Sequence, residues 1–143
     1  MLLACNTRGA LSTADMAIQP DMIGLIVSDV AASLRFYRTL GLDIPQGQEN
    51  EPFVEIRANG YRISWNSAEM IKQIDPTWTQ PSGGARMELA FKCDSPADVD
   101  VTYRKATGAG YRGHKEPWDA FWGQRYAIVV DPDGNHISLF APL

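Results

Sequence analysis

The sequence has few cysteines, no long apolar run and no excess of basic residues. Its 143 residues include only Cys5 and Cys93, which favour a reduced cytoplasmic protein over a disulfide-stabilised one. No apolar run approaches the ~20 residues that a membrane helix needs. The 13 basic residues are outnumbered by 17 acidic ones, for a net charge of −4, so neither nucleic acid nor an anionic membrane is expected as a partner.

Several catalytic signatures are also missing. The sequence contains no Ser/His/Asp set, no Cys-x-x-Cys pair, no Walker loop and no GxGxxG motif. Nucleophilic catalysis and nucleotide binding therefore lack their usual supports. What remains is a globular composition, 45% hydrophobic and 21% charged, in a length that suits one domain.

A strand, a helix and a hairpin follow one another twice along the chain. In the first half, the apolar run at residues 22–27 predicts a strand, a capped helical stripe follows, and Asn59-Gly60 predicts a hairpin turn. In the second half, residues 87–93 predict a strand, Asp94-Ser95-Pro96 a helix start, and residues 125–130 one arm of a hairpin. We therefore expect an α+β fold of two βαββ(β) modules, whose curled mixed sheet surrounds a cup with the helices outside.

The expected boundaries follow from this repeat. Residues 1–20 have no helical or strand periodicity and predict an irregular N-terminal extension, with Met16 as an alternative native start. The first module is expected at residues 21–66, a linker at 67–84 and the second module at 85–143, together one domain.

The final strand has a fainter copy in the first half. Aligning the glycine turns of the two hairpins places Arg62 on His136 and Ser64 on Ser138. Alternation along each strand puts all four side chains on the cup face. Together they favour a small-molecule pocket over a solvated sheet edge.

The order of the elements and several residues resemble the vicinal oxygen chelate superfamily, also called the glyoxalase/bleomycin resistance/dioxygenase family. The matching pieces are Ile26-Val27-Ser28-Asp29-Val30, the helical segment at residues 33–42, and the ending Asp131-Pro132-Asp133-Gly134-Asn135. The resemblance covers residues 22–142 and implies paired modules, usually a homodimer, with a cup-shaped site in the curled sheet. These motifs are specific for the fold and weak for function, because fold and chemistry separate readily.

The resemblance also points to four positions where metal-dependent relatives carry His, Gln or Glu ligands. A divalent metal held there binds two adjacent substrate oxygens. The matching positions in this chain are Met22, Ser64, Glu88 and Ser138. Because one carboxylate, one thioether and two hydroxyls make a poor divalent site, we expect no metal ligands and no cofactor.

The segment at residues 117–126 holds the densest chemistry that the repeat does not explain, with four aromatic residues among ten. We expect Trp118, Phe121 and Trp122 to line and close the cup by stacking on a flat ligand, and Arg125 to fix a polar end of that ligand. The structural alternative is that Trp118 and Trp122 fill a gap where the loop crosses the sheet.

Glu88 is expected in the middle of a strand, where burying an unpaired carboxylate would be costly. It could accept from a ligand amine or hydroxyl, or act as a base if its pKa were raised. The alternative is an internal salt bridge to Arg62 or Lys92. His114, in a polar stretch without a nearby partner in the sequence, is expected on the surface.

These observations favour a small-molecule binding protein similar to the bleomycin-resistance members of the superfamily. It would be a homodimer whose metal-free cups sequester an aromatic drug or secondary metabolite. The alternatives are a lyase or dioxygenase with a divergent metal site and a metal-free isomerase with Glu88 as its base. The residues expected to contact the ligand are Arg62, Ser64, Glu88, Trp118, Phe121, Trp122, Arg125, His136 and Ser138.

Overall fold

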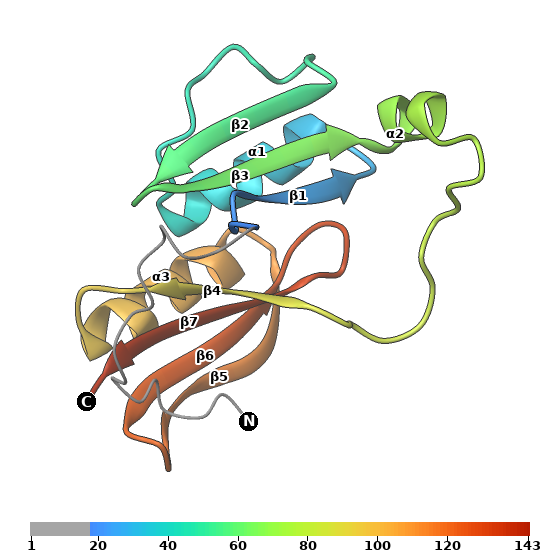
Figure 1. The fold of residues 1–143 in the computed structure, drawn as a ribbon. Helices are drawn as coiled ribbons and strands as arrows, with labels where there is room; N and C mark the ends of the chain where they lie inside the picture. The colour runs from blue at the N-terminus through green and yellow to red at the C-terminus, as the bar shows by residue number, and fades with distance from the viewer. Residues whose placement is uncertain (1–17) are drawn as a thin grey trace.

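The computed structural model describes residues 18–143 and contains the two expected modules, each a sheet with a helix on one face (Figure 1). The first module has a three-stranded sheet of order β1-β3-β2 and consists of β1 (Met22–Val27), α1 (Val30–Leu40), β2 (Phe53–Ala58) and β3 (Tyr61–Ser67). A short helix, α2 (Ala68–Ile74), leads into the connecting segment. The second module has a four-stranded sheet of order β4-β7-β6-β5 and consists of β4 (Glu88–Lys92), α3 (Pro96–Gly108), β5 (Arg112–Ala120), β6 (Gln124–Val130) and β7 (His136–Pro142).

The strand pairing confirms the internal repeat. β1 runs parallel to β3 with Met22 beside Arg62, and β4 runs parallel to β7 with Glu88 beside His136. In each module the last strand also pairs with an antiparallel neighbour, β2 or β6. The α+β fold of two βαββ(β) modules is therefore confirmed, but the strands form two separate sheets, because no hydrogen-bonded ladder joins β1 to β4.

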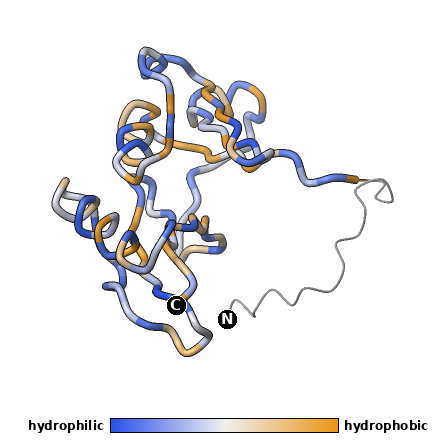
Figure 2. Tube along the Cα trace, turned by 90° about the vertical axis from the view of Figure 1, so that its left-hand side faces the viewer, coloured by the Kyte–Doolittle hydropathy of each residue, from blue (hydrophilic) through white to orange (hydrophobic). Residues whose placement is uncertain are grey.

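The last strand of each module buries one set of alternating side chains. Ile63 and Trp65 on β3, and Ile137 and Leu139 on β7, are at most 8% exposed. They belong to one hydrophobic core that both modules share. Hydrophobic and hydrophilic residues alternate along the trace of the described residues, without a long hydrophobic segment (Figure 2). No helix within residues 18–143 is long and apolar enough to cross a membrane.

The two long helices begin and end where the sequence signals predict. The side chain of Asp29 accepts from the amide of Ala32 at the start of α1, and Gly41 ends that helix with φ +108°. The side chain of Ser95 caps α3 in the same way, with Pro96 in its first turn. Because these signals are local, the sequence alone is sufficient to place both helices.

A buried tyrosine joins the two modules. The Tyr37 hydroxyl of α1 donates to Asp131 Oδ2 over 2.7 Å, and the Tyr37 ring meets the rings of Trp65 and Phe91 edge-on. Burial and the neighbouring Asp131 carboxylate raise the pKa of Tyr37 far above its ordinary value. The hydroxyl therefore stays protonated and remains a donor. The turn that carries Asp131, residues 131–135, is called the 131–135 turn below.

Strand β5 is absent from the sequence prediction. The sequence predicts only a polar stretch around His114 and an aromatic segment at residues 117–126, whereas residues 112–120 form a strand paired with β6. Two register shifts, between Gly113 and Lys115 and between Lys115 and Trp118, interrupt the alternation. A strand with such irregularities has no clean period of two, so periodicity does not reveal it. Met16 and Cys5 lie outside the described residues.

Candidate functional site

The face of the second sheet that turns away from α3 carries most of the expected site residues. Strand register places Ser138 beside Ile128, Phe140 beside Tyr126, and Tyr126 beside Trp118. The opposite face, with residues such as Ile137 and Leu139, packs into the core. We call the outward face the second-sheet face, formed by Glu88, Trp118, Tyr126, Ile128, His136, Ser138 and Phe140.

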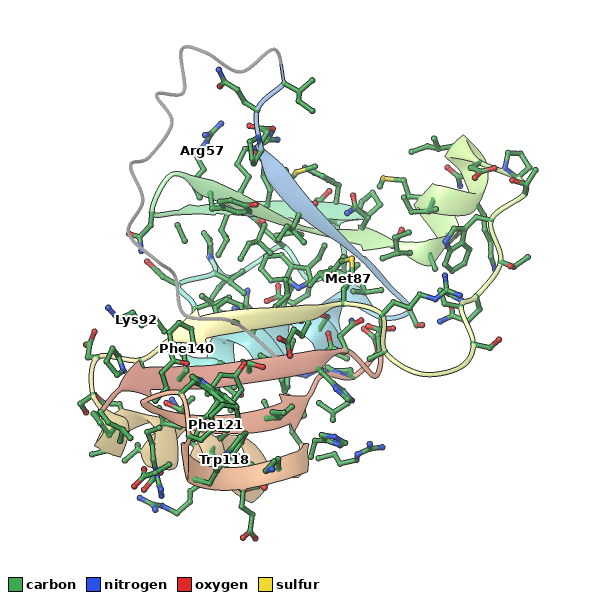
Figure 3. All side chains as sticks on the ribbon, turned by 60° about the horizontal axis from the view of Figure 1, so that its bottom comes forward. Arg57, Met87, Lys92, Trp118, Phe121 and Phe140 are labelled. Carbon is green, nitrogen blue, oxygen red and sulfur yellow. The ribbon has the colours of Figure 1, made fainter. Side chains whose placement is uncertain are left out.

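One end of this face is an aromatic wall, formed by Trp118, Phe121, Trp122, Tyr126 and Phe140. Figure 3 labels Trp118, Phe121 and Phe140. The Tyr126 ring centroid lies 5.3 Å from that of Trp118, 5.4 Å from that of Trp122 and 6.3 Å from that of Phe140. Phe121 sits edge-on to Trp122 at the tip of the hairpin and is 93% exposed. The wall is therefore packed at its base and open at its tip.

Two local contacts hold the wall in place. The Trp122 indole Nε1 donates to Gln124 Oε1 over 2.8 Å. The Lys115 ammonium lies 4.2 Å from the centroid of the Trp118 ring, a cation–π contact that occupies part of one ring face.

A hydrogen-bonded chain runs from the wall towards Glu88. The Ser138 hydroxyl donates to Glu88 Oε2 over 3.1 Å, and Tyr126 is hydrogen bonded to Ser138. Burial, with a contribution from the Glu88 carboxylate, raises the pKa of Tyr126 and keeps it protonated, although the bond to Ser138 opposes this.

Of these three hydrogen-bonded residues, Tyr126 is the one that the sequence does not predict as a site residue. The signal that could have identified it is its phase in β6, because Tyr126 and Ile128 alternate with Arg125 and Ala127. Counting from the final turn along the hairpin would have placed Tyr126 on the face of Ser138.

The other end of the second-sheet face carries a pair of histidines. The rings of His114 on β5 and His136 on β7 lie 4.4 Å apart between centroids, with 32° between their planes. His114 is exposed as expected, but it is not isolated. Residues 18–143 contain no group of three or more His, Cys, Asp or Glu residues that could hold a metal ion.

The four positions that correspond to metal ligands in relatives also fail a test of donor chemistry. Glu88 accepts from Ser138, and Ser64 accepts from Asn66 Nδ2 over 3.0 Å. Both hydroxyls are thus already in hydrogen bonds, and the fourth position, Met22, offers only a thioether. This donor set does not fit a divalent cation.

The structure keeps Arg62 and Ser64 on the first sheet, apart from the aromatic wall. Arg62 forms ion pairs with Asp21 and Glu55, each over 2.5 Å. These carboxylates raise the pKa of Arg62 above its ordinary value. The alternative salt bridge between Arg62 and Glu88 is not formed.

Arg125 lies on the helix side of the second sheet. Its Nε donates to Asp100 of α3 over 2.9 Å, and its Nη1 to Asp119 over 3.1 Å. Arg125 therefore ties the β5–β6 hairpin to α3. The expected residues that the structure does bring together are Glu88, Trp118, Phe121, Trp122, His136 and Ser138.

Two uncharacterized mycobacterial proteins match most of the chain in sequence. An uncharacterized protein of Mycobacterium bovis is 29% identical over 128 residues, which cover 83% of this chain and 80% of that protein. An uncharacterized protein of Mycobacterium tuberculosis H37Rv is also 29% identical over 128 residues, covering 72% of its length.

Solved structures extend the comparison. A glyoxalase/bleomycin resistance protein/dioxygenase family enzyme from Burkholderia phytofirmans superposes with a TM-score of 0.76 at 20% identity, covering 88% of this chain and all of the other. A glyoxalase-related enzyme from Fulvimarina pelagi gives 0.72 at 22% identity, covering 86% and 87%. A protein of unknown function from Agrobacterium tumefaciens gives 0.68 at 28% identity, covering 90% and 97%.

The sequence profile of one family spans nearly all of both modules. It matches residues 19–139, from just before β1 to the fourth residue of β7. With the repeated βαββ(β) topology and the matching solved folds, this match assigns the chain to the glyoxalase/bleomycin resistance protein/dioxygenase superfamily.

Proposed function

We propose that this chain is a small-molecule binding protein that sequesters an aromatic drug or secondary metabolite on its second-sheet face, without metal. The observation that carries the proposal is the aromatic wall, which is open at Phe121 and continues into the chain of Tyr126, Ser138 and Glu88. A flat ligand would stack on the wall while a polar substituent meets the Glu88 carboxylate. At stoichiometric amounts such a binder lowers the free concentration of a toxin without chemistry.

The size of each interaction supports a binding role. An aromatic pair contributes ~0.5–1.5 kcal/mol beyond the area that it buries. A hydrogen bond to a charged group contributes ~1.5–3 kcal/mol. Two stacked rings, one such bond and the burial of a drug-sized apolar surface are sufficient for a dissociation constant in the micromolar range, which corresponds to about −8 kcal/mol.

Tryptophan fluorescence tests this proposal directly. Titration of the full chain with a panel of planar aromatic antibiotics is expected to quench the emission of Trp118 and Trp122 saturably for at least one member, with a rise in Tm. Mass spectrometry of the released ligand is expected to show it unchanged. The absence of quenching and of a thermal shift with every member would contradict the proposal. A chemically altered ligand would instead favour a metal-free isomerase in which Glu88 takes a proton.

We further propose that two copies of the chain associate through the open face of the first sheet. Met22, Ile26 and Phe53 share that face through their strand register and are 41%, 38% and 39% exposed. Three large apolar side chains on one exposed sheet face are typical of an interaction surface. In such a dimer, the first sheet of one copy would lie opposite the second-sheet face of the other.

Light scattering coupled to size exclusion measures this association. The unmodified chain is expected to be a dimer at micromolar concentration, and Phe53→Arg is expected to weaken the dimer by at least about tenfold, since an interface anchor contributes more than ~1 kcal/mol. Ile74→Arg is the matched control, because Ile74 on α2 is also exposed but lies outside that sheet face. A monomeric unmodified chain would contradict the proposal.

A further inference from the structure

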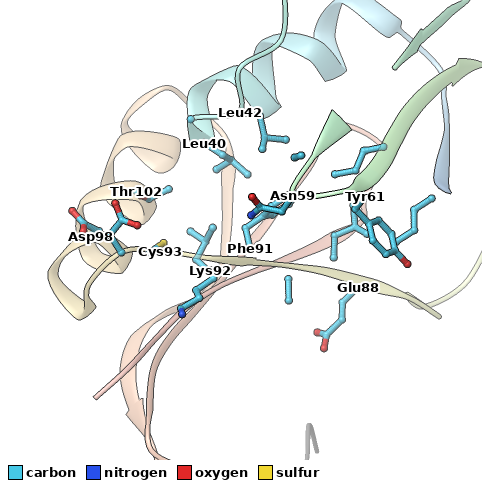
Figure 4. Close-up of a pocket in the computed structure, with 18 residues that line it drawn as sticks. Leu40, Leu42, Asn59, Tyr61, Glu88, Phe91, Lys92, Cys93, Asp98 and Thr102 are labelled. Atoms are coloured by element: carbon cyan, nitrogen blue, oxygen red, sulfur yellow. The ribbon is translucent and has the colours of Figure 1, made fainter. Parts of the chain in front are cut away.

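A cavity lies between the two modules, on the side of β4 that faces α1. Its volume is about 770 Å³, within the usual range of small-molecule sites. The end of α1, the β2–β3 turn, β4 and the first turns of α3 surround it (Figure 4). Glu88 borders both this cavity and the second-sheet face, but no residue of the aromatic wall lines the cavity.

The internal repeat explains why the cavity exists. At the equivalent place in the other half, the β1–α1 junction packs against the 131–135 turn. There the Ser28 amide donates to Asp133 over 2.9 Å, and Tyr37 donates to Asp131. These contacts close the gap between the modules at that end.

The second copy of the repeat lacks the residues that would close the gap. The position equivalent to Asp131 is Arg57, and the position equivalent to Phe36 is Thr102, a much smaller side chain. Tyr103, the equivalent of Tyr37, lies instead against Gly113 on β5. The two halves therefore differ at these positions, and Thr102 lines the cavity.

The lining combines apolar walls with acidic groups at one end. The walls come from Leu42 on one side and from Leu89 and Phe91 on β4. Asp94 and Asp98 stand at the start of α3, and neither forms an ion pair with a basic residue of the described chain. The one lysine of the lining, Lys92, extends from β4 away from Leu40 and Leu42 (Figure 4).

The half-buried thiol of Cys93 lies between these acids and the apolar walls. Burial raises the pKa of Cys93, and the carboxylates of Asp98 and Asp94 raise it further. The same negative potential that disfavours a thiolate would disfavour an anionic ligand and favour a cation.

We propose that this cavity binds a small organic cation with an apolar body, such as an alkyl or aryl amine. The apolar body lies against Leu42, Leu89 and Phe91, and the ammonium group lies at Asp94 and Asp98. Burial of the body supplies most of the affinity. The two carboxylates, of which Asp98 accepts only from the Ser95 hydroxyl and neither is in an ion pair within residues 18–143, supply the preference for a cation over a neutral or anionic analogue. The aromatic wall contributes no residue to this site, and Asp94 and Asp98 lie outside the second-sheet face.

The reactivity of Cys93 measures occupancy of the cavity. In a Cys5→Ser chain, modification of Cys93 by methyl methanethiosulfonate is followed by mass spectrometry in the presence of hexylammonium, hexanol or hexanoate. Because only the empty site reacts, hexylammonium at about ten times its dissociation constant is expected to slow the reaction about tenfold. Hexanol is expected to protect only at higher concentration, and hexanoate not at all. N-acetylcysteine controls for direct effects on the reagent.

Two variants separate the parts of the proposal. Thr102→Phe introduces the side chain that the other half carries and is expected to abolish protection by hexylammonium, while the aromatic wall still responds in the fluorescence titration. Asp94→Lys changes an exposed residue. It is expected to raise the dissociation constant of hexylammonium by about threefold or more and to leave that of hexanol unchanged.

Three results would overturn the inference. They are no protection by hexylammonium, equal protection by hexanoate, and unchanged protection in a folded Thr102→Phe chain. If Thr102→Phe does not fold, the Asp94→Lys comparison decides alone, because equal loss of hexylammonium and hexanol there would remove the argument for a cation.

Discussion

Replacing Asp131 by alanine is expected to lower the free energy of unfolding by about 3–4 kcal/mol. Asp131 is 4% exposed. Its carboxylate accepts from the Tyr37 hydroxyl, from Asn135 Nδ2, and from the backbone amides of Asp133 and Asn135, over 2.7 to 3.0 Å. Alanine would leave a buried hydroxyl and the turn amides without an acceptor, and each unsatisfied buried donor costs ~1–3 kcal/mol.

Chemical denaturation followed by circular dichroism measures this loss against two matched variants. Asp131→Asn keeps one acceptor oxygen and is expected to cost less than half as much. Asp133→Ala removes only the acceptor for the Ser28 amide at an exposed bond and is expected to cost about 1 kcal/mol or less. If Asp131→Ala were as stable as Asp133→Ala, the 131–135 turn would not be the joint between the modules.

The 131–135 turn and its contact with Tyr37 show what the sequence can and cannot predict. The turn itself has a strong local signal, since Asp131-Pro132-Asp133-Gly134 directly precedes an alternating strand. The contact of Asp131 with Tyr37 spans 94 residues, and nothing near either residue indicates it. Local signals therefore predicted the modules, while the packing between them required coordinates.

The candidate site divides in the same way. The repeat alignment matched Arg62 with His136, and the structure places the two at equivalent registers, Arg62 beside Met22 and His136 beside Glu88. The repeat could not place Arg125, because its counterpart in the first half lies before the start of β2, and because β5 is irregular. Once the β6 register is known, Arg125 alternates away from Tyr126 and reaches Asp100 on α3.

Arg62 shows a further limit of alternation. Its position in the repeat is as expected, but alternation along a strand does not predict which charged side chains form ion pairs with it. Cross-strand register places Arg57 beside Arg62, and Glu55, two residues along β2, provides the carboxylate. A diagonal pair of this kind is within reach of long side chains. The charge of Arg62 is therefore already matched on the first sheet.

The largest expected effect on ligand binding belongs to Trp118. Trp118→Ala is expected to raise the dissociation constant of the aromatic ligand by about 30-fold or more, since truncating a central aromatic anchor costs ~2–4 kcal/mol. The Trp118 ring contacts the rings of both Trp122 and Tyr126. Its loss removes a stacking surface and also the support for its neighbours. Isothermal titration calorimetry measures the change without relying on tryptophan emission.

The structural alternative for Trp118, that it only fills a gap over the sheet, makes a different prediction. In that case Trp118→Ala would have a lower Tm, but its dissociation constant for the ligand would be unchanged at a temperature where the variant is folded. Trp118→Phe retains an aromatic ring and is expected to recover most of the affinity that Trp118→Ala loses. If Trp118 only filled space, the two variants would differ in Tm and not in affinity. Trp78→Ala is the matched control, because Trp78 lies in the segment between α2 and β4, beside Lys72 and outside the wall. Equal loss of affinity in Trp78→Ala and Trp118→Ala would place the ligand elsewhere than on the second-sheet face.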